Sequence, residues 1–363
     1  MTANTITIED ARQQLIETHR VATLGMPEDV WLSLRGLGIG ASEAAAAVGA
    51  SEHRTPFEIA ERKLGLVSDD ADANYRRKMK MAMGHVMEPV TAARFAEFTG
   101  LNVQNYNFML AHPEHPFMLA NIDRRIVGVT DAQAAWLELV MGQTVKGPGV
   151  AELKNVEFAQ GWGKPDNVHT TGGLCTSGEV PEDYFIQVQQ QLAVTGYEWG
   201  FLVVTIAGWE TRWYPILRDD ELIDDLIALE GDLWAAIQRG ELPDIDVEHP
   251  KALDLLKRLY PGTDGRVVAM AELEHWKKVE EDAKSEIKAL ETTAKTARAR
   301  ILKAMGSAAV AAFPDGTCYR RKEVKRAGYE VAPTSYIDCR VAKLNKAELE
   351  QLEESAAQDE KAA

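Results

Sequence analysis

Apolar residues recur every three or four positions near the C-terminus, and this pattern predicts a long amphipathic helix over residues 273–305. At a rise of about 1.5 Å per residue, the helix is roughly 50 Å long. Its apolar stripe is narrow, which is typical of a helix that packs against one partner helix, in the same chain or in a second one. The stripe comprises Leu273, Trp276, Val279, Ala283, Ile287, Leu290, Ala294, Ala297, Ile301 and Met305.

The first hundred residues predict helices separated by glycine, proline and polar breaks. The clearest helix start is Thr55-Pro56-Phe57-Glu58, because Thr55 and Glu58 can form a capping box around a proline at the first helical position. This helix is expected to end near Gly65, and a polar loop is expected over 69–78. The other predicted helices are 7–24, 27–35, 43–48 and a helix that carries Gly84–Pro89 and ends at Gly100.

Short apolar runs in the middle of the chain predict a β-meander behind these helices. The runs lie at 101–110, 117–127, 133–140 and 149–156. A Gly/Thr/Ser-rich stretch, 160–180, is expected to be a long loop over the site. The elements predicted after it are a helix from Pro181 to Gly196, a buried strand at 201–206, an edge strand at 211–216 and a helix at 219–239.

These elements predict an α/β fold in three parts. Residues 1–243 are expected to form the main domain, because the pattern changes near Leu242-Pro243-Asp244. Residues 244–344 are expected to form a C-terminal α+β appendage that contains the long helix and short strands. The Ala/Glu/Lys/Gln-rich end, 345–363, is expected to be a disordered tail.

Composition places the chain among soluble globular proteins of the cytoplasm. No apolar stretch is long enough to cross a bilayer, the N-terminus lacks a basic segment followed by an apolar one, and three scattered cysteines do not make a disulfide framework. The net charge of −16 does not exclude DNA as a partner, because a local basic groove can bind phosphates on an acidic protein.

The candidate chemistry lies in the strand-like run Gly149–Val156. Alternation places Val150, Glu152 and Lys154 on one face, which is expected to be the exposed face of a half-buried strand. An isolated Glu-x-Lys is most often a simple ion pair, but Asp123 precedes it at an expected bend between two strands. Two carboxylates can bind Mg²⁺ or Mn²⁺, and a lysine can position the attacking water. The arrangement favours metal-dependent phosphodiester hydrolysis.

Several motifs, in order, resemble those of the lambda-type or YqaJ-like phage exonucleases of the PD-(D/E)xK superfamily. The motifs are Arg35…Gly38-Ile-Gly-Ala-Ser42, Arg54-Thr-Pro-Phe57, Gly84-His-Val-Met-Glu88-Pro89, Asn121-Ile-Asp123, Glu152-Leu-Lys154 and Gln187-Val-Gln-Gln-Gln191, within about 31–216. The resemblance implies a restriction-endonuclease-like core, with a mixed central sheet flanked by helices. It also implies a Mg²⁺-dependent 5′-to-3′ exonuclease on double-stranded DNA ends that works with a single-strand annealing recombinase. A ring-like homotrimer or homotetramer is the expected assembly.

The resemblance also implies roles for individual residues. Asp123 and Glu152 match metal ligands, together with the carbonyl of Leu153, and Lys154 matches the catalytic lysine. Glu88 matches a helix-borne acid near two metal ions, although a surface carboxylate would have the same pattern.

A second group matches residues around the reacting phosphate. Gln187 and Gln191 match a helix that lines the active site, or else form a polar helix face. Arg35 and Ser42 match the pocket for a 5′-terminal phosphate, in which a glycine-rich turn and an arginine fork bind the anion. Ser42 can equally be an ordinary N-cap.

The chain departs from the family pattern after Asp123. Arg124 replaces the usual glycine. Glu152 does not follow until 29 positions after Asp123, whereas the family reaches its Glu-x-Lys soon after the first acid. The extra segment, Val129 to Gly147, is expected to be an inserted β-hairpin, and its Asp131 is a rival or additional acid.

Other motifs favour less specific interpretations. The chain has no phosphate-binding loop of the ATPase type, and Pro113 disrupts the helix that a zinc site at His112 and His115 would need. The basic run 319–326 with Tyr329 fits a solvated edge strand or a DNA-contacting arm equally well. Two further hypotheses for the whole chain are an endonuclease of the same superfamily and a non-catalytic DNA-binding scaffold.

Overall fold

The computed structural model describes residues 6–67, 75–165, 167–169, 172–175 and 179–322, together with Lys346, Ala347 and Glu350. The chain forms two compact units, Met1–Leu256 and Lys257–Ala363, called here the larger and the smaller unit. No helix among the described residues is long and apolar enough to cross a membrane.

A seven-stranded mixed sheet forms the centre of the larger unit, with strand order β3-β6-β7-β10-β11-β9-β8. Its middle strands β7 and β10 are parallel to each other. On either side of them, β6 is antiparallel to β7 and β11 is antiparallel to β10, whereas β9 is parallel to β11. The strands are β3 (Asn102–Asn105), β6 (Arg124–Val127), β7 (Gly149–Val156), β8 (Asn167–His169), β9 (Gly172–Leu174), β10 (Trp199–Ile206) and β11 (Glu210–Leu217).

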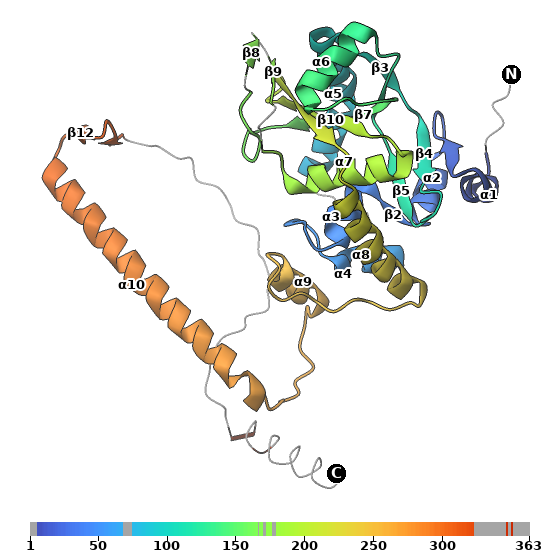
Figure 1. Ribbon diagram of the computed structural model, residues 1–363. Helices are drawn as coiled ribbons and strands as arrows, with labels where there is room; N and C mark the ends of the chain where they lie inside the picture. Colours follow the sequence, from blue (N-terminus) through green and yellow to red (C-terminus); the bar gives the residue numbers. More distant parts are fainter. Residues whose placement is uncertain are drawn as a thin grey trace. The chain divides into compact units, whose positions relative to one another are not determined.

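Helices cover both faces of this sheet (Figure 1). Every residue of β10 is buried because its alternate side chains enter two separate cores. Phe201 and Val203 pack in the cluster that includes Phe95 of helix α5 (Tyr75–Thr99), while Leu202 and Val204 pack against Val188 of helix α7 (Glu182–Thr195). The predicted class, a mixed central sheet flanked by helices, is confirmed.

A smaller four-stranded sheet, of order β1-β4-β5-β2, adjoins the N-terminal helices. Its strands are β1 (Arg20–Ala22), β2 (Ile39–Gly40), β4 (Phe108–Ala111) and β5 (Met118–Asn121). The remaining helices of the larger unit are α1 (Ile8–Thr18), α2 (Glu28–Arg35), η1 (Ala41–Glu43), α3 (Ala44–Ala47), α4 (Pro56–Lys63), α6 (Asp131–Met141), α8 (Asp220–Gln238) and α9 (Ala252–Leu259), the last of which continues beyond Leu256.

Local capping signals identified several helix ends correctly. Thr55 and Glu58 form the predicted capping box of α4, and Gly65 follows that helix with φ of +70°. Gly100 and Gly196, both with φ near +70°, follow α5 and α7 as predicted. A left-handed backbone at these positions suits glycine because it has no Cβ.

Five expectations about local structure are wrong. The insertion predicted as a β-hairpin is helix α6, which a capping box at Thr130 and Gln133 begins, so the strand predicted at 133–140 is also helical. The helix predicted over 7–24 ends at Thr18 and is followed by β1. The loop predicted over 160–180 contains β8 and β9. Because β9 pairs with β11, β11 is not an edge strand.

The smaller unit contains the predicted long helix, α10 (Glu274–Met305). A short helix, η2 (Ala271–Leu273), precedes it, and the hairpin of β12 (Val310–Ala312) and β13 (Cys318–Arg320) follows it. Of the predicted basic run, residues 319–322 are described, whereas residues 323–326 and Tyr329 lie outside the described residues. Most of the predicted tail, 345–363, also lies outside them.

Candidate active site

Strand β7 places Glu152 and Lys154 on the sheet face that α7 covers. Glu152 is only 3% exposed, so the expectation of an exposed carboxylate is wrong: α7 packs over this strand. The Nζ atom of Lys154 lies 2.7 Å from Glu152 Oε1 and 2.9 Å from Gln187 Oε1. The face of β7 therefore carries a shielded, hydrogen-bonded acid–lysine pair.

Two glutamines of α7 hold both oxygens of the Glu152 carboxylate. Gln187 Nε2 donates to Oε1 at 2.6 Å, and Gln191 Nε2 donates to Oε2 at 2.7 Å. The residues are four positions apart and so lie one helical turn apart on one face. Gln191 Nε2 also donates to the carbonyl of Asn121 at 2.9 Å, which links α7 to the end of β5. The buried glutamine face is thus part of the site.

Asp123 lies between β5 and β6 and reaches the neighbouring strand. Its Oδ2 accepts a hydrogen bond from the backbone N–H of Leu153 at 2.8 Å, which places the carboxylate beside Glu152. Burial raises the pKa of Asp123 well above its usual value, and repulsion from Glu152 and Glu88 adds to the shift, against the attraction of Lys154. The site therefore holds more negative charge than its own cations offset.

Lys154 remains protonated in this environment. Burial alone would lower its pKa, but the carboxylates of Glu152 and Asp123 outweigh burial, so the net shift of the Lys154 pKa is upward. Its Nζ also lies 4.6 Å from the ring centre of Tyr184, a position in which the ring face attracts a cation. The lysine is a fixed positive charge and hydrogen-bond donor.

Glu88 of α5 forms an ion pair with Arg124 of β6. The same Nη1 of Arg124 donates to the backbone carbonyl of Asp123 at 2.6 Å. Arg124 is only 7% exposed, so this pair is shielded from solvent on the arginine side. Arg124, which stands where the family usually has glycine, thus contacts both Glu88 of α5 and the backbone at Asp123.

The donor set suits a hard divalent cation. Glu88, Asp123, Glu152 and Leu153 line one cavity of about 410 Å³, and carboxylate and carbonyl oxygens are the ligands that Mg²⁺ and Mn²⁺ prefer. Among the described residues, no three His, Cys, Asp or Glu side chains already converge as a metal-binding group. Glu152 instead accepts from Lys154 and the glutamines, and Glu88 pairs with Arg124. Metal binding at this cavity therefore requires these carboxylates to exchange partners.

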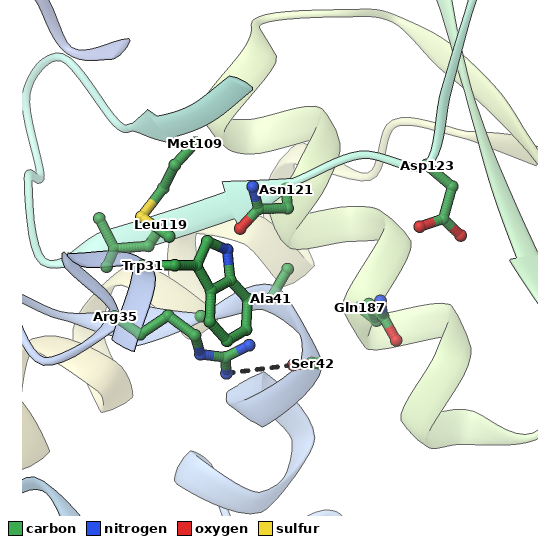
Figure 2. Close-up of a pocket in the computed structure, with 10 residues that line it drawn as sticks. Trp31, Arg35, Ala41, Ser42, Met109, Leu119, Asn121, Asp123 and Gln187 are labelled. Carbon is green, nitrogen blue, oxygen red and sulfur yellow. Dashed lines mark hydrogen bonds between the residues drawn. The ribbon is translucent and has the colours of Figure 1, made fainter. Parts of the chain in front are cut away.

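A second cavity, of about 170 Å³, lies beside the glycine-rich turn between α2 and η1 (Figure 2). Arg35 Nη2 donates to Ser42 Oγ at 3.3 Å, and its guanidinium stacks over Trp31, 5.1 Å from the ring centre. A Cβ at Gly40 would lie 3.0 Å from Arg35 Nη2, so a larger residue there would push the guanidinium away by a few tenths of an ångström. The turn thus brings together the arginine and serine predicted to bind a terminal phosphate.

A buried ion network behind the turn fixes Arg35. Oε2 of Glu43 lies 3.1 Å from Arg35 Nη2, 2.8 Å from Lys63 Nζ and 3.1 Å from the backbone nitrogen of Gly40. Lys63 also donates to the Arg35 carbonyl at 2.8 Å. Burial opposes the Glu43 charge, but Arg35 and Lys63 outweigh it and hold the Glu43 pKa at about 2.

Sequence reasoning missed both Glu43 and Lys63. Glu43 had a weak signal, as the acidic residue three positions after Gly40 at a helix start. Lys63 had no sequence signal, because it lies on α4, 20 positions from its partner.

The two cavities adjoin, since Ser42 and Asp123 line both of them. Figure 2 shows Arg35 and Ser42 on one side of the smaller cavity, with Asp123 and Gln187 on the other. Asp131 is absent from both linings and lies exposed in the first turn of α6, so the structure does not place this rival acid at the site.

The fold and the site define an α/β protein whose main sheet carries an acid–lysine cluster beside a cavity lined by Arg35 and Ser42, called here the arginine pocket. Residues 30–198 match the model of the YqaJ-like viral recombinase domain family. A Bacillus subtilis (strain 168) protein, the uncharacterized protein YqaJ, is 32% identical over 245 residues, which cover 66% of this chain and 65% of that relative. Over these residues the chain is similar to the YqaJ-like viral recombinase domain, and it spans about two thirds of the length of the Bacillus relative.

Two solved structures are also similar, and both contain LHK-Exo, an alkaline exonuclease from Laribacter hongkongensis. The first is 16% identical with a TM-score of 0.39 and covers 64% of this chain and 100% of the other. The second, LHK-Exo in complex with dAMP, is 18% identical with a TM-score of 0.39 and covers 64% and 97% of the two chains.

Proposed function

We propose that this protein is a Mg²⁺-dependent exonuclease, with Mn²⁺ as a substitute ion, that digests linear double-stranded DNA from 5′-phosphorylated ends. The observation that supports this proposal best is the junction of the two cavities: Ser42 and Asp123 line both the arginine pocket and the acid–lysine site. A terminal phosphate at Arg35 would leave the adjacent phosphodiester beside Asp123 and Glu152. The match of residues 30–198 to the model of a viral recombinase domain supports DNA as the substrate.

Asp123, Glu152, the Leu153 carbonyl and, after release from Arg124, Glu88 are the groups that would hold the metal. When bound, a divalent ion lowers the pKa of its water and polarises the phosphate. Gln187 and Gln191 orient Glu152 without competing for a proton, because their amides are neutral donors. Lys154, which stays protonated, orients the attacking water and offsets negative charge in the transition state.

The arginine pocket would select the 5′ end. Glu43 remains ionised and offsets one of the two charges on Arg35 and Lys63, so the network has a net positive charge towards the cavity. Arg35 and Ser42 then present donors to the phosphate oxygens. An end without its phosphate would offer no anion to the net positive charge of Arg35 and Lys63, and such an end should be digested more slowly.

The test uses purified protein, Mg²⁺ and duplex DNA that is either linear with 5′ phosphate, linear with 5′ hydroxyl, or a closed circle. Linear phosphorylated duplex should disappear fastest, and the circle should persist. Glu152→Gln and Lys154→Ala should each lower the rate by at least about a hundredfold, as expected for lost metal or charge stabilisation. Asp131→Asn is the matched control, because it neutralises the exposed acid on α6, and it should digest at the normal rate.

Each contrary outcome points to a different conclusion. Cleavage of the closed circle would replace the exonuclease with an endonuclease, and equal rates on both linear ends would refute the role of Arg35. The absence of any metal-dependent digestion would refute the enzyme and favour a DNA-binding scaffold. We also propose a ring-like homotrimer or homotetramer and a single-strand annealing recombinase as partner, to be tested by sedimentation and by co-purification with the annealing protein of the same genome.

A further inference from the structure

The C-terminal end of α10 and the hairpin after it form a strongly basic surface within the smaller unit. From residue 294 to residue 322 the sequence has seven cationic residues and one acidic residue, a net charge of +6 in a chain of net charge −16. This segment is called here the basic end. Its cationic residues are Lys295, Arg298, Arg300, Lys303, Arg320, Arg321 and Lys322, and its acidic residue is Asp315.

Most of these charges are not neutralised within the unit. In the first part of α10, lysines pair with acids one turn away, as Lys277 does with Glu281 and Lys284 with Glu280. In the basic end only Lys295 has such a pair, with Glu291 at 3.4 Å. Across the described part of the chain, four exposed cations of the basic end have neither an ion pair nor a ring contact or side-chain hydrogen bond: Arg300, Lys303, Arg320 and Lys322.

Specific contacts hold the hairpin on the end of the helix. The Arg298 guanidinium lies 4.6 Å from the ring centre of Tyr319, and Phe313 packs edge-on against the same ring at 5.8 Å. Arg321 donates through its side chain to the carbonyl of Gly306 and through its backbone to Ala309 at 2.8 Å. The charges of β13 and of the last helical turns are therefore presented together by one folded element.

A structural role explains only part of this charge. Cations in the last turn of a helix interact favourably with the helix dipole, which accounts for Lys303 and adds a reason for Arg300. The dipole gives no reason for Arg320 and Lys322, which lie at the end of the hairpin. On a chain this acidic, unpaired cations on one surface point to a polyanionic partner.

We propose that the basic end binds the sugar–phosphate backbone of duplex DNA outside the active site and so keeps the substrate attached between cleavage events. The choice of DNA over other polyanions rests on the proposed function. Duplex DNA has one negative charge per about 1.7 Å of its axis, so several cations spread over a helix end and a hairpin can be neutralised at once. Arginine contributes paired donors that match phosphate oxygens.

The experiment measures binding of the full chain to a blunt 40-base-pair duplex by fluorescence anisotropy, in EDTA and at several salt concentrations. The test variant neutralises the four unpaired cations, as Arg300→Gln, Lys303→Gln, Arg320→Gln and Lys322→Gln. The control variant neutralises four lysines of the first part of α10, as Lys277→Gln, Lys278→Gln, Lys284→Gln and Lys288→Gln. Both variants change the net charge equally, so the comparison separates local from overall charge.

The test variant should bind at least about tenfold more weakly at 100 mM salt. The slope of log K against log salt should fall by about 3 to 4, as expected for four lost phosphate contacts. The control variant should stay within about twofold of the wild type. Equal losses in both variants would overturn the proposal, as would no loss in either one.

Two further measurements keep the result specific. A variant with Arg300→Lys and Arg320→Lys preserves the charge and should retain most of the affinity; loss of binding there would refute a charge-based contact. Sedimentation without DNA should give the same oligomeric state for all variants, and a change only in the test variant would show that the basic end binds a second copy instead. Because EDTA stops hydrolysis, binding can succeed or fail independently of the nuclease activity.

Discussion

Glu230 provides a quantitative test of the larger unit because its carboxylate is buried without a partner. The residue lies on α8 with an exposed fraction of 0%, and neither carboxylate oxygen has a hydrogen-bond partner among the described residues. Burial raises the pKa of Glu230 well above its usual value, and repulsion from Glu43 adds to this, while Lys63 opposes it. The folded protein therefore favours the protonated form of Glu230, next to the ionised Glu43 network.

The sign of the pH effect follows from proton linkage. Between the unfolded pKa of about 4.5 and the raised folded pKa, the folded state keeps a proton that the unfolded state releases. Stability from Glu230 is thus fully present below the unfolded pKa and is lost as pH rises towards the folded pKa, by at most about 1.4 kcal/mol per pH unit. Between pH 5 and pH 7 the loss amounts to up to about 2.7 kcal/mol.

The variant Glu230→Gln mimics the protonated carboxyl and cannot titrate. Its free energy of unfolding should be close to that of the wild type at pH 5, and its excess over the wild type should grow with pH to at most about 2.7 kcal/mol at pH 7. Urea unfolding followed by tryptophan fluorescence measures this difference, and seven of the eight tryptophans lie in the larger unit. Glu221→Gln, which alters an exposed carboxylate of the same helix, should show no such trend. A constant difference between wild type and Glu230→Gln from pH 5 to pH 7 would refute a protonated Glu230.

Three other substitutions test the site, the core and a helix. Arg124→Gln removes the positive charge that pairs with Glu88. Mn²⁺ should therefore bind at least about tenfold more tightly in calorimetry, which corresponds to about 1.4 kcal/mol of binding free energy. Unchanged or weaker Mn²⁺ binding would contradict competition between Arg124 and the metal for Glu88. Gly149→Ala places a Cβ 2.6 Å from the buried Trp199 ring and should destabilise the protein by about 1–3 kcal/mol in urea unfolding. Gly84 lies on α5, and a Cβ there would meet no described atom within 4 Å, so Gly84→Ala should stabilise the protein by up to about 1 kcal/mol. Effects of the same sign in both glycine variants would contradict the packing around Trp199.

Short-range patterns predicted the parts of the site that lie close together in sequence. Strand alternation predicted that Glu152 and Lys154 lie on one face of the strand, and helical spacing predicted that Gln187 and Gln191 lie on one face of their helix. In the structure these two faces contact each other. The sequence could not show that α7 buries this face, because whether a strand face is covered depends on a helix more than thirty residues away. The exposure of Glu152 was predicted wrongly for that reason.

Long-range contacts behind the arginine pocket had no sequence signal. Arg35, Glu43 and Lys63 come from three different elements, and Glu230 approaches them from a fourth. Each residue alone looks like a surface charge on a helix, which is the usual position of Glu and Lys. These charges form a buried network only because α4 and α8 pack around the glycine-rich turn between α2 and η1.

The two departures from the family pattern differ in their effect on the site. The long interval between Asp123 and Glu152 is absorbed by α6, because β6 still pairs directly with β7 and Asp123 still accepts from Leu153 at 2.8 Å. A longer connection adds little to the free energy of closing a loop, since that cost grows only with the logarithm of its length. The single change to Arg124 acts inside the site, where its guanidinium pairs with Glu88 and contacts the Asp123 carbonyl. For this chain, one side chain next to the proposed metal ligands should therefore affect metal binding more than an insertion of a whole helix.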